Sequence, residues 1–166
     1  FLCDGLSEGI INALAQVQGL KVIARSSSFR FKDGKTPVPR MARMLGVQTL
    51  VTGAVSEISG RLRITVDLVA ADGAQVWGMQ YSPRLSELAS VEAGISSEIA
   101  QRIGARLTEF DRNKLSKTVK VNPEAYALFL RARYHLRLYT PQSREKAAGY
   151  YEQALAIDPG FALAHA

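Results

Sequence analysis

The stretch Arg61-Leu62-Arg63-Ile64-Thr65-Val66-Asp67-Leu68 alternates polar and apolar residues more regularly than any other part of this sequence. Successive side chains of a strand point to opposite faces, so the pattern predicts a strand with one buried face and one face in water. Ser59-Gly60 before it and Asp72-Gly73 after it are suited to tight two-residue hairpin turns, because glycine tolerates the backbone that such turns need. We therefore expect a three-stranded antiparallel meander.

The two turns also predict how the three strands pair. The first turn places Val55 opposite Ile64, and the second places Leu68 opposite Trp77. Both registers turn the same side chains inward, whereas a slip by one residue would turn each of them to the other face. This agreement supports the meander and predicts that Trp77 belongs to the core.

Helical and extended patterns precede the meander. Apolar residues at three- and four-residue steps predict a helix over 6–17, and a β-branched run predicts a strand over 20–25. After a polar loop at 26–35, a short helix that stops at Gly46 leads to a strand beginning at Val47. The order strand, helix, strand predicts a right-handed parallel βαβ crossover.

A helical stripe over 85–110 follows the meander and is expected to cover its apolar face. The predicted fold class is thus α/β of the α+β kind. It has a mixed sheet, with a βαβ crossover and a three-stranded antiparallel meander covered by helices.

The C-terminal part has a different organisation. Two helical patterns, at 123–138 and 144–156, predict a helical hairpin. The second helix and the proline that follows it have the spacing of a tetratricopeptide repeat, where small residues permit close helix contact: Ala147, Tyr151, Ala154 and Pro159. We predict three regions: an α/β domain at 1–112, a linker at 113–121, and a repeat region at 122–166 that includes the start of a second repeat.

Composition narrows the function classes. The net charge is +6, and residues 113–166 carry 8 basic and 4 acidic side chains, without the clustered stripe that nucleic-acid binding normally shows. One cysteine and two histidines are too few for a disulfide or a common zinc site, and we predict no metal and no cofactor. The longest apolar run, 125–130, is far below the roughly 20 residues that cross a bilayer. Membrane contact is expected only through a segment outside this chain.

Two motifs resemble catalytic loops without their full context. Gly5-Leu6-Ser7-Glu8-Gly9 fits the nucleophile-elbow pattern, but no strand precedes it and both histidines lie in the repeat region. Gly34-Lys35-Thr36 lies where a phosphate-binding loop would end, but Phe29 stands where that loop needs a glycine. We predict no catalytic residue in this chain.

Two groups of side chains are candidates for binding. The polar loop carries residues that could bind an anion: Ser26, Ser27, Arg30, Lys32 and Lys35. Arg133 and Arg137 share a helix face by their four-residue spacing, and they could bind an acidic partner. For both groups the alternative interpretation is that the charged side chains are simply exposed to solvent and bind nothing.

Several short segments resemble a known family in their order and spacing: Phe1-Leu2-Cys3-Asp4-Gly5-Leu6-Ser7, Val22-Ile23-Ala24-Arg25-Ser26-Ser27, Leu45-Gly46-Val47, Gly53-Ala54-Val55, Arg61-Leu62-Arg63-Ile64, and Val76-Trp77 with Tyr81. Residues 1–112 resemble the TolB-like amino-terminal domain that occurs with tetratricopeptide repeats in bacterial signalling proteins. The resemblance implies a shape similar to anticodon-binding domains and an attached effector, such as a winged helix, an adenylate cyclase or a kinase. It also implies a bacterial protein that is either cytoplasmic or the periplasmic part of a membrane-anchored one.

One departure from the family bears on partners. The family normally begins with an apolar strand before the Phe-x-x-Asp-Gly segment, and this sequence opens at Phe1. An exposed sheet edge can pair with another chain, so we expect a homodimer through that edge. The opening without Met or a basic leader also suggests part of a longer protein.

The leading hypothesis is a non-catalytic regulatory or sensory region whose repeat array binds a protein or peptide. One alternative is a nucleic-acid-binding module with an anticodon-binding-like fold. Another is the accessory region of a cyclase or kinase whose catalytic domain lies outside this chain.

Overall fold

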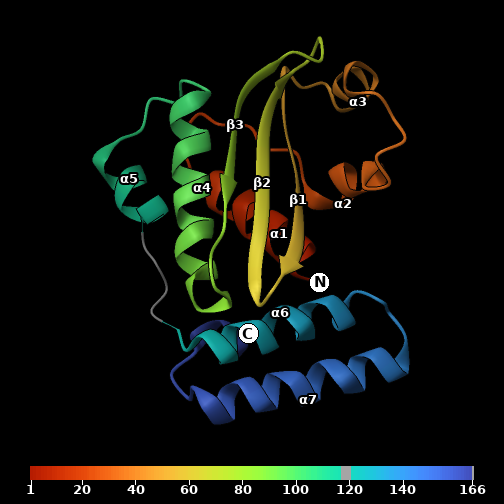
Figure 1. The fold of residues 1–166 in the computed structure, drawn as a ribbon, viewed down its shortest axis with the longest axis vertical. Coiled ribbons are helices and arrows are strands. Elements are labelled where there is room, and N and C mark those ends of the chain that lie inside the picture. Colours follow the sequence, from red (N-terminus) through yellow and green to blue (C-terminus); the bar gives the residue numbers. More distant parts are fainter. Residues whose placement is uncertain (117–120, 166) are drawn as a thin grey trace.

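A three-stranded antiparallel sheet with helices on one side forms one part of the molecule, and a helical hairpin lies at its end (Figure 1). The computed structural model describes residues 1–116 and 121–165. The strands β1 (Thr49–Ile58), β2 (Arg61–Ala70) and β3 (Gln75–Tyr81) lie in the order β1-β2-β3. The predicted α+β class is confirmed.

The predicted strand pairing is also confirmed. Val55 lies opposite Ile64 across β1 and β2, and Leu68 lies opposite Trp77 across β2 and β3. The register then shifts between Leu68 and Val69, so that Val69 lies opposite Gln75. Trp77 is half-buried and packs against the core, so the β2 pattern does distinguish the buried face from the wet one.

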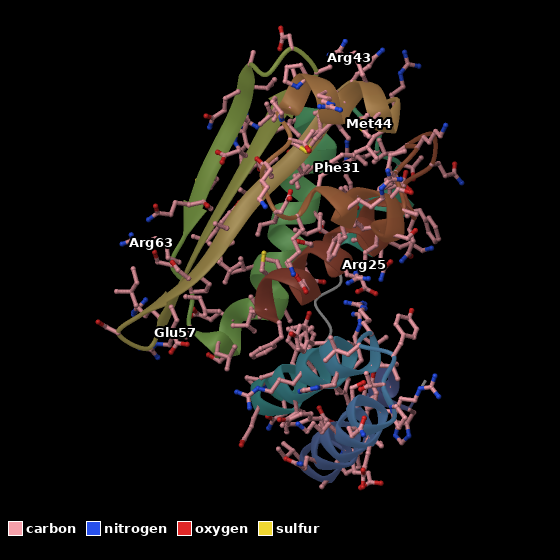
Figure 2. All side chains as sticks on the ribbon, turned by 90° about the vertical axis from the view of Figure 1, so that its right-hand side faces the viewer. Arg25, Phe31, Arg43, Met44, Glu57 and Arg63 are labelled. Carbon is pink, nitrogen blue, oxygen red and sulfur yellow. The ribbon has the colours of Figure 1, made fainter. Side chains whose placement is uncertain are left out.

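Two helices cover the apolar face of the sheet. They are α1 (Leu2–Leu14) and α4 (Leu88–Arg102), and both lie on the same side of the strands in Figure 2. Their apolar stripes and the inner face of β2 form one core, which includes Leu6, Ile10, Ile64, Leu68, Ile95 and Ile99. At roughly 25 cal/mol per Å² of apolar surface, burial of this kind is the main stabilising term of the fold.

The predicted βαβ crossover is wrong, because residues 20–24 form no strand and the described sheet is entirely antiparallel. Leu20 and Val22 still pack against the core, which accounts for their apolar character. The backbone N–H groups of Ser27 and Ser28 donate to the Ala24 carbonyl and begin a helical turn.

Short helices replace part of the predicted polar loop. They are α2 (Arg25–Ser28) and the 3-10 helix η1 (Phe29–Phe31). The next helix, α3 (Val38–Leu45), ends as predicted at Gly46, whose φ of 65° is the left-handed conformation that favours glycine. The first strand begins at Thr49, two residues after the predicted start.

The single helix predicted over 85–110 is also wrong. A 3-10 turn, η2 (Leu85–Glu87), leads into α4, and α5 (Glu109–Ser116) is a separate helix. Gly104 adopts a φ of 71° and ends the first helix, while Thr108 and Asp111 exchange hydrogen bonds that begin the second. Phe110 is therefore 61% exposed and lies outside the buried stripe to which its spacing assigned it.

The predicted helical hairpin is present as α6 (Pro123–Leu136) and α7 (Pro141–Ile157), followed by the 3-10 turn η3 (Ala162–Ala164). Asn122 caps the first helix and Thr140 the second. The helices approach closely at fully buried alanines, Ala132, Ala147 and Ala154. This packing agrees with the spacing that suggested a repeat, and the assignment to the tetratricopeptide class stays a prediction.

The predicted division into domains also stays a prediction. Of the linker at 113–121, residues 113–116 belong to α5, and 117–120 lie outside the described residues. Buried residues of the hairpin, such as Phe129 and Leu130, belong to the same core cluster as Leu6 of α1. No helix in the described parts of the chain has both the length and the apolar character to cross a membrane.

Candidate functional site

A cluster of charged side chains lies where α1, α2 and the hairpin meet. Glu8 of α1 forms ion pairs with three arginines: Arg25 of α2, and Arg133 and Arg137 of α6. The Arg25 Nε lies 3.5 Å from the Glu8 Oε2. Figure 2 shows Arg25 at the end of the sheet domain that faces the hairpin. We call these four residues the arginine junction.

A further ion pair lies one helical turn away along α1. The Lys32 Nζ is 2.5 Å from the Asp4 Oδ1, and Asp4 and Glu8 stand four residues apart on α1. Side chains four residues apart occupy one helix face, so α1 presents both carboxylates together, and α6 presents Arg133 and Arg137 in the same way. The pairing of these two faces joins segments that lie more than 100 residues apart in the sequence.

Aromatic rings support two of the guanidinium groups. The Arg25 guanidinium lies 4.1 Å from the centroid of the Phe29 ring, and that of Arg133 lies 5.3 Å from the centroid of Phe129. Such cation–π contacts are worth about 0.5–1 kcal/mol at exposed sites and more where water is excluded. The rings therefore hold both arginines near Glu8.

The arginine junction is largely buried. The Arg133 and Arg137 side chains are 18% and 19% exposed, and that of Glu8 is 17% exposed. Burial lowers the pKa of Arg137, while the nearby Asp4 acts in the opposite direction. Three guanidinium groups share one carboxylate in this setting, so the junction carries an excess of positive charge.

A buried carboxyl group lies behind the junction. The Tyr126 hydroxyl of α6 donates a 2.7 Å hydrogen bond to the Glu92 Oε2 of α4. Burial raises the pKa of Glu92 to about 7, although the bond from Tyr126 and the charge of Arg133 act to lower it. A Cβ at Gly9 of α1 would overlap the Glu92 carboxylate, so a larger residue at this position would force the Glu92 side chain to move.

The structure distributes the predicted anion-binding set along the 25–35 segment. Ser26 and Ser27 lie in α2, and Arg30 lies in η1 with its guanidinium 5.9 Å from the Phe31 ring centroid. Lys32 pairs with Asp4, and Lys35 follows the turn at Gly34. Anion binding by these residues stays a prediction.

The predicted partner-binding pair, Arg133 and Arg137, lies inside the junction rather than on an open face. Sequence reasoning missed Glu8 and Arg25, which complete the cluster. One sequence signal could have identified the cluster: Asp4 and Glu8 stand four residues apart, and so do the oppositely charged Arg133 and Arg137. In residues 1–116 and 121–165, no group of three or more His, Cys, Asp or Glu side chains is arranged to hold a metal ion.

Comparison with known proteins gives one informative match. No family model matches this chain. A protein named "Putative adenylate cyclase 3" from Rhizobium meliloti (strain 1021) is 34% identical to it over 168 residues. The match covers 100% of this chain and 28% of that protein, so the chain spans less than a third of its relative's length.

Proposed function

We propose that this chain is a non-catalytic regulatory and protein-interaction region of a bacterial signalling protein related to an adenylate cyclase. The similarity to a protein of that name supports this most directly, because it extends over the whole chain and over only 28% of the relative. In this proposal, cyclic AMP synthesis belongs to the remainder of such a protein. The chain controls it or connects it to other molecules.

The arrangement of helices suits a part that transmits a conformational change. Helix α1 packs in one core with the sheet, with α4 and with α6, and the arginine junction pairs it with both α2 and α6. Packed interfaces switch between discrete arrangements rather than deforming gradually. We propose that the sheet domain receives a signal, that the hairpin presents a protein-binding surface, and that the junction couples them.

Cyclic AMP formation provides the test. The purified chain, incubated with ATP and Mg²⁺ or Mn²⁺, should form no cyclic AMP. The relative with its matching segment deleted should retain catalysis at a changed rate, and insertion of this chain at that position should restore part of the difference. Steady nucleotide turnover by the chain alone, abolished by Ser7→Ala or Lys35→Ala, would overturn the non-catalytic assignment.

The open edge of the sheet supports a second element of the proposal, a homodimer. Strand β1 is an edge strand in the order β1-β2-β3, and its Val51 and Ile58 are 42% and 47% exposed. Edge strands offer unpaired backbone groups to a second strand. Light scattering should show a dimer as concentration rises, and a monomer at high concentration would exclude this edge as a self-association site.

A further inference from the structure

We propose that the guanidinium groups of Arg25, Arg133 and Arg137 bind a small oxyanion beside Glu8, either free phosphate or the phosphate group of a larger ligand. The site lies between α2 and α6, so an occupant would connect the sheet domain to the hairpin. This inference is independent of the proposed role in cyclase signalling.

The charge balance of the region is the first argument. Arg25, Arg133 and Arg137, whose side chains are 30%, 18% and 19% exposed, carry three positive charges, whereas their shared partner Glu8 carries one negative charge. Excess charge held away from water is costly unless a counter-ion compensates it. A doubly charged anion would balance the excess.

The neighbouring carboxyl group supplies only part of that compensation. Glu92 lies within electrostatic reach of Arg133, but its pKa of about 7 leaves it about half protonated at neutral pH. In residues 1–116 and 121–165, Glu8 is the one carboxylate in ion-pair contact with Arg25, Arg133 or Arg137.

The geometry of arginine is the second argument. A planar guanidinium presents its N–H groups as a fork that matches two oxygens of a phosphate, and such charge-assisted pairs are among the stronger hydrogen bonds. The Arg25 Nε is buried and, although it lies 3.5 Å from the Glu8 Oε2, it makes no hydrogen bond among the described residues. The Phe29 ring fixes this guanidinium in place, which lowers the entropy lost when a ligand binds.

Glu8 is the competitor of the proposed ligand, because its carboxylate occupies donors that an oxyanion would use. Neutralising Glu8 should therefore strengthen anion binding, whereas neutralising an arginine should weaken it. A cluster that serves only to join the helices predicts no anion binding in either variant. The opposite signs separate the two interpretations even if one variant is less stable.

Isothermal titration calorimetry with inorganic phosphate, pyrophosphate and ATP, at constant ionic strength set by chloride, tests the proposal on the full 166-residue chain. Arg133→Gln and Arg137→Gln should each raise the Kd by roughly tenfold or more, and Glu8→Gln should lower it. The exposed Arg144→Gln on α7 is the matched control and should leave the Kd unchanged. Far-ultraviolet circular dichroism confirms that each variant is folded.

Four outcomes are decisive. Tighter binding of ATP than of the inorganic anions identifies a phosphate-bearing ligand, and equal binding identifies a free oxyanion; both support the site. An equal Kd for Glu8→Gln, Arg133→Gln and the parent chain overturns it, as does the absence of binding by both the parent and Glu8→Gln.

Discussion

Glu92→Gln should make the chain more stable at pH 8 and remove most of the pH dependence of its stability between about pH 4.5 and 7. Glu92 faces Tyr126 and Arg133 from α6, and Gly9 from α1. Glutamine keeps the hydrogen-bonding capacity of the side chain and carries no charge. The variant therefore isolates the cost of a buried carboxylate.

The magnitude follows from the pKa. Folding raises the pKa of Glu92 from its ordinary value of 4.5 to about 7, so the folded chain holds this proton more tightly than the unfolded chain. The free energy of unfolding is then greatest below about pH 4.5 and decreases as the pH rises through this window. One pKa unit corresponds to about 1.4 kcal/mol, so the free energy of unfolding above pH 7 is lower than that below pH 4.5 by on the order of 3 kcal/mol.

Urea unfolding followed by the fluorescence of Trp77, the one tryptophan in the sequence, measures this effect at a series of pH values from 5 to 8. Other groups also contribute to the pH dependence of stability, so the quantity compared is the difference between the parent chain and Glu92→Gln. The exposed Glu145→Gln on α7 is the control. Parallel pH profiles for the parent and Glu92→Gln would refute the assignment of a raised pKa to this carboxyl group.

Three further changes test the fold by urea unfolding. Gly104→Ala should lower the free energy of unfolding by about 1–2 kcal/mol, because Gly104 has a positive φ. Gly149→Ala, in open space on α7, should raise it by about 0.5–1 kcal/mol. Equal effects of the two substitutions would contradict the helix end at Gly104. Ile64 is 1% exposed, and Ile64→Ala should lower the free energy of unfolding by about 2–5 kcal/mol, whereas Val76→Ala, at an exposed residue, should change it little. A similar loss of stability from both substitutions would contradict the assigned face of the sheet. Asn122→Ala should lower the free energy of unfolding by about 1 kcal/mol and reduce the helical circular dichroism signal. Unchanged stability would argue against the capping role of Asn122.

The meander was predictable because its determinants are local. The alternation in β2 and the glycines at both turns specify the pairing of Val55 with Ile64 and of Leu68 with Trp77, and the structure confirms each pair. The hairpin was predictable for the same reason. In both cases, neighbouring segments of the sequence pair with each other.

The errors arose where a local pattern had two interpretations. The apolar character of 20–24 suits a strand, but it also suits an extended segment that packs on the core without strand pairing. The apolar stripe over 85–110 continues across Gly104, whereas the hydrogen bonds between Thr108 and Asp111 begin a separate helix, α5.

The arginine junction could not be derived from local patterns. Glu8 and its partners Arg133 and Arg137 belong to different helices, and only the packing of α1 against α6 brings them together. Each helix shows a charged pair with four-residue spacing, which is also common on solvated faces. The packing of these helices is the information that the sequence patterns lack.

The distance in sequence between Glu8 and its two α6 partners also affects how the chain folds during synthesis. The ribosome makes α1 before α6, and Arg133 and Arg137 follow Glu8 by more than 100 residues, on the order of ten seconds at typical elongation rates. Until then, Glu8 has only Arg25 of the junction to pair with, whereas the meander needs no residue beyond Tyr81 for its strands. We expect the sheet domain to form first on the nascent chain, and the attachment of α6 to complete the native arrangement of α1.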